Sequence, residues 1–82
     1  MPTVLRANGF QVRIYTEDHT ERPHVHVWKA GTVVVIELAT TGSPQEVREA
    51  EGMRQSDVNG AFRLVAMNAT YLLHQWRKIH GS

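Results

Sequence analysis

The dipeptide Asn8-Gly9 constrains the fold of this chain more than any other feature. It stands between two segments, 3–7 and 10–16, in which apolar residues alternate with other residues. Asn and Gly both tolerate positive φ angles, so the pair predicts a two-residue turn between antiparallel strands. Counting outward from the turn predicts that one face carries the pairs Ala7 with Phe10, Leu5 with Val12, and Thr3 with Ile14. Arg6, Arg13 and Tyr15 then take the opposite face.

A second hairpin is predicted around Ala30-Gly31, between segments 24–29 and 32–38. In a strand, residues two apart share a face, so His24, His26 and Trp28 project together while Val25 and Val27 point into the core. With a two-residue loop, the predicted pairs are Val27 with Val34, Val25 with Ile36, His26 with Val35, Trp28 with Val33, and His24 with Glu37.

The rest of the chain is predicted to contain a short strand and a helix. We favour a strand over a helical turn for 45–50, ended by Gly52. Ser56 is a suitable N-cap, Asp57 follows it, and Gly81 marks the end of the helix. Apolar residues recur between them at helical spacing: Val58, Ala61, Phe62, Val65, Ala69, Leu72, Leu73, Trp76 and Ile79.

The predicted fold is therefore a single α+β domain over residues 1–82. An antiparallel sheet of four to five strands (3–50), built from two hairpins, is covered on one face by one long C-terminal helix (56–80). The covered face carries Phe10, Val12, Ile14, Val25, Val27, Val34 and Ile36.

Composition excludes several functional classes. The 82 residues include no cysteine, which excludes disulfides, thiolate zinc sites and cysteine nucleophiles. The start of the chain lacks a signal-peptide pattern and the longest apolar run, 33–36, cannot cross a bilayer, so we expect a cytoplasmic protein without a membrane partner. The formal charge of +1 supports nucleic-acid binding only weakly, and the positive charges after residue 57 are typical of a basic helix end.

The histidine strand offers candidate metal ligands. His19, His24, His26 and Glu37 supply nitrogen and oxygen donors of the kind that zinc or a similar divalent metal binds. His19 would have to fold back from the preceding loop to complete the set. The alternative is structural, because Glu37 could simply accept a hydrogen bond from His24.

The same face offers candidate catalytic residues. His24, His26 and Glu37 could transfer a proton, with Arg13 on the same face stabilising a phosphate, as in a small ribonuclease-type hydrolase. Such combinations are also common on polar sheet faces, so the pattern is not specific.

One helix covers only one face of a sheet, which predicts an interface on the other. The interface candidates are Tyr15, Trp28, Val33 and Val35, with Trp28 as the expected hot spot. A homodimer or a complex with a small protein partner would cover them.

Several segments of the chain together resemble a known family. They are Met1-Pro2-Thr3-Val4-Leu5-Arg6, the Gly9-Phe10-x-Val12-x-Ile14-Tyr15 strand, Asp18-His19, Pro23-His24-Val25-His26-Val27, and Trp76-Arg77-Lys78-Ile79-His80-Gly81. The family is the domain of unknown function 4160 family, which has no established activity. The resemblance implies a bacterial cytoplasmic protein, often encoded beside another small protein, as in toxin–antitoxin pairs. The leading expectation is a protein-interaction module, or one component of a toxin–antitoxin-like pair; the alternative is a metal-binding protein or hydrolase.

Overall fold

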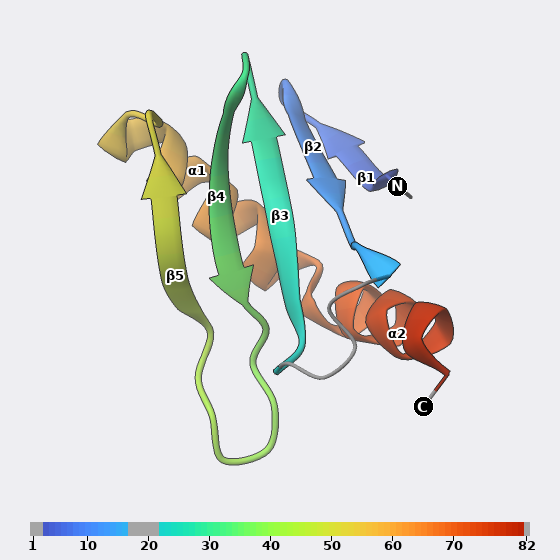
Figure 1. The fold of residues 1–82 in the computed structure, drawn as a ribbon. Coiled ribbons are helices and arrows are strands. Elements are labelled where there is room, and N and C mark those ends of the chain that lie inside the picture. The colour runs from blue at the N-terminus through green and yellow to red at the C-terminus, as the bar shows by residue number, and fades with distance from the viewer. Residues whose placement is uncertain (1–2, 17–21, 82) are drawn as a thin grey trace.

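The computed structural model describes residues 3–16 and 22–81. The described elements are β1 (Thr3–Ala7), β2 (Phe10–Arg13), β3 (His24–Lys29), β4 (Thr32–Glu37), β5 (Glu46–Glu51), α1 (Gln55–Met67) and α2 (Ala69–His80) (Figure 1). The strands form one antiparallel sheet in the order β1-β2-β3-β4-β5. The α+β class and the five-stranded sheet agree with the prediction.

The β1–β2 hairpin turns at Asn8 and Gly9, whose φ angles are 53° and 83°. The two predicted pairs nearest the turn are present. The predicted pair Thr3–Ile14 is wrong, because the register shifts within β1 and Thr3 pairs with Arg13 instead. Such a bulge places two residues of one strand opposite one residue of its partner.

The β3–β4 hairpin turns at Ala30 and Gly31, with φ angles of 48° and 79°. All five predicted pairs are present, including His24 with Glu37. Strand β5 lies one residue beyond the predicted 45–50 and pairs with β4. The second hairpin therefore follows its turn signal, although a positive φ is uncommon for alanine.

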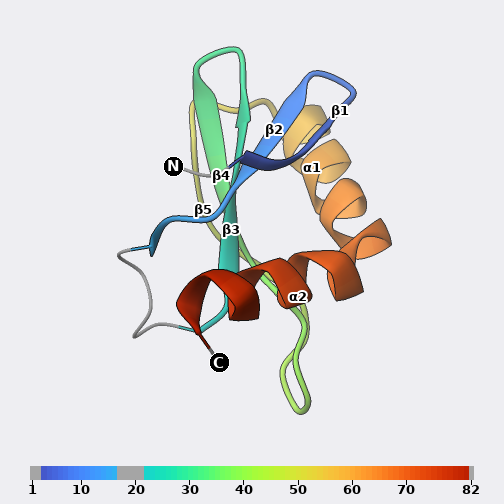
Figure 2. The same ribbon diagram turned by 90° about the vertical axis from the view of Figure 1, so that its right-hand side faces the viewer.

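The core lies on the predicted face of the sheet. Figure 2 shows α1 along this face and α2 across one end of the sheet. The buried cluster contains Phe10, Val12, Ile14, Val25, Val27, Val34, Ile36 and Leu38 from the sheet side, and Val58, Ala61, Val65, Leu72 and Trp76 from the helices. Phe62, one of the residues at helical spacing, packs against the cluster as a half-buried residue.

The prediction of one long helix over 56–80 is wrong, because Asn68 separates α1 from α2. Asn68 has φ −122° and ψ 22°, outside the helical range. Its side-chain Nδ2 donates a 2.9 Å hydrogen bond to the Leu64 carbonyl, and its backbone N–H donates one of 3.1 Å to the Val65 carbonyl. These bonds satisfy carbonyls that the end of α1 leaves open, so the chain can turn and lay α2 across the end of the sheet.

The ends of the helical region agree with the prediction in part. Ser56 is not the N-cap: α1 begins at Gln55 after Arg54, which makes no side-chain capping bond. Asp57 lies in the first turn, where a negative charge stabilises the helix by interacting with its dipole. Gly81 ends α2 in the left-handed conformation, as predicted. Among the residues described, no helix is both long and apolar enough to cross a membrane.

Candidate binding face

Figure 2 shows α1 against one face of the sheet; the opposite face is here called the open face. Because cross-strand partners share a face, the strand pairing defines its rows. The first row is Arg6, Gln11, Trp28, Val33 and Glu51; the second is Arg13, His26, Val35 and Glu49; the third is His24, Glu37 and Glu46. Tyr15 follows β2 and contacts Trp28 and His26 on this face.

The charges of the open face lie at opposite edges. Arg6 and Arg13 stand on β1 and β2, whereas Glu46, Glu49 and Glu51 stand on β5. Arg6, Glu49 and Glu51 are exposed, and none of the three makes an ion pair within the part of the chain that the structure describes. Arg48, also on β5, pairs with Glu37, and Glu46 lies near Arg22, so Glu49 and Glu51 make the β5 edge acidic opposite the basic β1 edge.

The predicted interface residues lie on or beside the three inner strands of this face. Trp28 and Val33 are cross-strand partners and both are half-buried, as is Tyr15. Val35 is only 5% exposed, so it forms the floor of the face and offers little surface to a partner.

A continuous set of ring contacts and one hydrogen bond, here called the ring cluster, connects the open face to α2. Its members are Trp28, Tyr15, His26, His24, Trp76 and His80. The Trp28 indole N–H donates a 3.0 Å hydrogen bond to the Tyr15 hydroxyl. The Tyr15 ring stands edge-on to His26 with centroids 4.4 Å apart, and the His24 and His26 centroids are 5.4 Å apart.

The cluster continues from the sheet into the helix. The His24 ring centroid lies 5.0 Å from that of Trp76, which stacks on His80 at 3.8 Å. His80 Nε2 lies 3.2 Å from the Tyr15 carbonyl oxygen, so the contacts return to the sheet. His80 Nδ1 also lies 3.0 Å from the Trp76 carbonyl oxygen, and histidines near a helix C-terminus commonly bond to its last carbonyls.

Glu37 lies across from His24, as predicted, but its carboxylate is bound by two arginines. Arg22 Nη1 donates to Oε1 at 2.7 Å, and Arg48 Nε donates to Oε2 at 3.1 Å. Arg22 also donates to the carbonyls of Leu38 and Pro44. Sequence reasoning missed both arginines, because one precedes β3 and the other stands at the β5 bulge, where a one-residue shift brings it beside Glu37.

The structure brings together only part of the predicted metal set. His24 and His26 share the open face, and His24 is 1% exposed, with its Nδ1 2.8 Å from the Arg22 carbonyl oxygen. His19 lies outside the described residues. Within the described ranges, no three histidine or acidic side chains are grouped closely enough to hold a metal ion.

The predicted catalytic arginine has local partners. Arg13 pairs across the strands with His26, on the same face as predicted. Its guanidinium donates a 2.7 Å hydrogen bond to Gln11 and lies 5.2 Å from the centre of the Trp28 ring. Arg13 therefore contributes a cation–π contact beside the centre of the open face.

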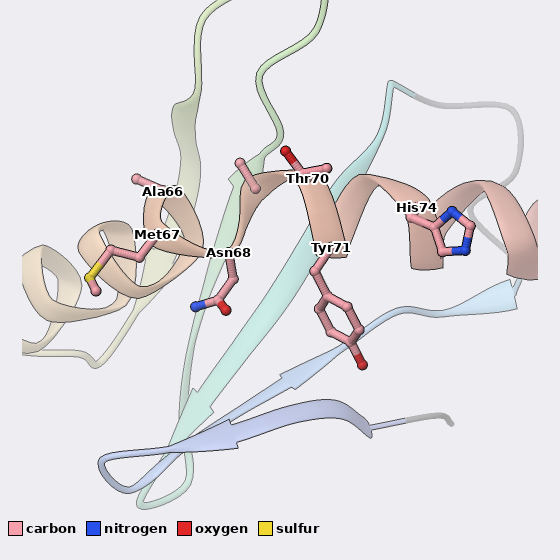
Figure 3. A pocket seen from close by; sticks show the side chains of 7 residues that line it. Ala66, Met67, Asn68, Thr70, Tyr71 and His74 are labelled. Carbon is pink, nitrogen blue, oxygen red and sulfur yellow. The ribbon is translucent and has the colours of Figure 1, made fainter.

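A separate hollow lies at the junction of α1 and α2, away from the open face (Figure 3). Asn68 and Tyr71 project on the side that faces β1, and the Tyr71 hydroxyl donates a 2.8 Å hydrogen bond to the Val4 carbonyl. Met67, which also lines the hollow, is 79% exposed. With His74 and Tyr71 as its titratable lining residues, the hollow offers mainly apolar contact.

Comparison with known proteins identifies the family. No curated protein and no solved structure matches the chain. A family model described as a domain of unknown function (DUF4160) matches residues 9–77. The matched segment contains β2 to β5, α1, and every member of the ring cluster except His80. The chain belongs to the DUF4160 family.

Proposed function

We propose that this chain is a protein-interaction module and that the open face is its binding surface. The observation that carries the proposal is the Trp28–Val33 pair, half-buried on the two inner strands β3 and β4, on the sheet face opposite α1. Apolar centres with charged rims are typical of protein interfaces.

The environment of Trp28 supports its role as the anchor. Its one polar group, the indole N–H, already donates to Tyr15, so burying the ring against a partner leaves no donor unpaired. The ring cluster also fixes the position of the Tyr15 side chain. An anchor held in place before binding loses less conformational entropy when the complex forms.

The finer form of this proposal is a bacterial cytoplasmic pair of the toxin–antitoxin kind, with this chain as one component. The support for it is the family resemblance and an open face with a defined centre. In that case a small companion protein would cover Trp28.

A photocrosslinking experiment tests the proposal. A benzophenone amino acid is placed at Gln11, beside Trp28 in the first row, or at the exposed Arg77 of α2 as the control position. We expect covalent adducts with a partner protein when the benzophenone is at Gln11 and none when it is at Arg77. Trp28→Glu should abolish the adducts, whereas Met67→Glu, which also adds an acid at an apolar site, should not. Equal adducts from both positions, or none from Gln11, would contradict the proposal.

A metal or acid/base site is the second candidate function, favoured by the close approach of the His24 and His26 rings. A metal site needs a third donor from outside the described groups, and a hydrolase would use His26 with Arg13, its cross-strand neighbour. Metal analysis of protein purified without a histidine tag is the test. Stoichiometric zinc that is lost in His26→Ala would support this candidate over the interaction module.

A further inference from the structure

We infer that the partner of the open face is a second copy of this chain, related by a two-fold axis that runs parallel to the strands over β3. The inference rests on the proposed function, because it uses the open face as the interface. The arrangement of charge carries it: Arg6 and Arg13 stand at one edge, and Glu49 and Glu51 at the other.

Symmetry restricts how two such faces can meet. Two identical sheets pack face to face about a two-fold axis that lies in the plane between them. An axis parallel to the strands exchanges the edges, so that β1 of one copy lies over β5 of the other. An axis across the strands lays β5 on β5 and places glutamates against glutamates. Charge complementarity therefore selects the parallel axis.

The rows of the sheet give the expected contacts. Arg6 and Glu51 are the two ends of one row, and Trp28 is its centre. An axis parallel to the strands keeps the rows level, so Arg6 of each copy faces Glu51 of the other. The two Trp28 rings then meet at the axis. Two symmetric ion pairs then flank the two Trp28 rings. Neither Arg6 nor Glu51 has an ion-pair partner within the described monomer.

The size of the face limits the area that a dimer can bury. Five strands about 4.8 Å apart and about 20 Å long give a projected area of roughly 400 Å² per copy. This is about half of the roughly 800 Å² per partner in standard stable interfaces. We therefore expect a weak dimer that sedimentation detects at high protein concentration, and that added salt dissociates because exposed charges contribute to it.

Charge reversal tests the paired edges. Arg6→Glu and Glu51→Arg should each weaken self-association by about tenfold, because like charges then meet twice in every dimer. Mixing the two variants should restore association, since opposite charges again meet at both edges. Arg77→Glu makes the same charge change on the exposed surface of α2 and should have no effect. Circular dichroism confirms that each variant is folded.

Cross-linking tests the direction of the axis. Because the chain has no native cysteine, only the introduced cysteines can react. Arg6→Cys mixed with Glu51→Cys should form a cross-link, and the other Arg6–Glu51 pair of that mixed dimer remains intact. Neither variant should cross-link alone, because like positions are about 19 Å apart across the sheet. Self-cross-linking of Glu51→Cys would overturn the axis. If the wild-type protein stays monomeric at every concentration, the proposal that the partner is a second copy is wrong. Benzophenone adducts with another protein would still support the proposed function.

Discussion

The Trp28 indole donates a 3.0 Å hydrogen bond to the hydroxyl of Tyr15, which lies just beyond the end of the neighbouring strand β2. Tyr15 also reaches α2 through its carbonyl oxygen, 3.2 Å from His80 Nε2. Tyr15 thus contacts both Trp28 on the open face and the last turn of α2. A mutation can therefore remove the Tyr15 hydroxyl and leave its backbone carbonyl beside His80 in place.

Tyr15→Phe should lower the free energy of unfolding by about 1 kcal/mol, because the Trp28 N–H loses its acceptor while the ring contacts remain. Urea unfolding measures the change. Tyr71→Phe removes a hydroxyl that donates to the Val4 carbonyl at an exposed site and should cost less. In a Trp28→Phe background, Tyr15→Phe should have almost no effect; an undiminished loss there would show that this hydrogen bond is not its cause.

Glu37 should stabilise the start of β3 through Arg22 rather than through His24. Glu37→Gln removes the charge that Arg22 and Arg48 share. A double-mutant cycle with Arg22→Gln should give a coupling free energy of about 1 kcal/mol, because the side chains are 28% and 18% exposed and partly screened. The coupling should shrink in high salt. A larger coupling of Glu37 with His24 than with Arg22 would contradict this assignment.

Mutation of Trp76 should destabilise the protein more than mutation of any other residue in the helical region. It is 4% exposed and packs in the core cluster as well as against His24. Trp76→Ala should cost about 3 to 5 kcal/mol, as expected for a buried aromatic residue. Met67→Ala, at a side chain 79% exposed, serves as the control and should leave the urea midpoint nearly unchanged. Equal midpoints for the two variants would mean that α2 does not depend on Trp76 for its docking.

Asn68 should hold the break between the helices. Asn68→Ala removes the side-chain donor to the Leu64 carbonyl and should destabilise the protein by about 1 kcal/mol, although alanine is the better helix former. Asn59→Ala is the matched control: Asn59 lies exposed on α1, and its side chain bonds with Gln55 of the same helix. That control should be neutral or slightly stabilising. Stabilisation by Asn68→Ala would show that the break is imposed by packing alone.

The sequence by itself determined the two hairpins, most of their register and the two faces of the sheet. Asn8-Gly9 and Ala30-Gly31 specify turns of fixed length, and a fixed turn sets which residues face each other along antiparallel strands. The pairing of His24 with Glu37 follows from this counting alone. These features are local, since they depend on residues close to each turn and on the two-residue period of a strand.

Only the tertiary structure decided where the helix breaks and which side chains meet at the site. The apolar spacing continues through Asn68, so periodicity could not reveal the break; a side-chain bond to Leu64 and the docking of α2 produce it. Arg22 reaches Glu37 across 15 positions, and His80 reaches Tyr15 across 65. Contacts of this kind depend on how distant elements pack, because no local pattern encodes the position of α2 against the end of the sheet.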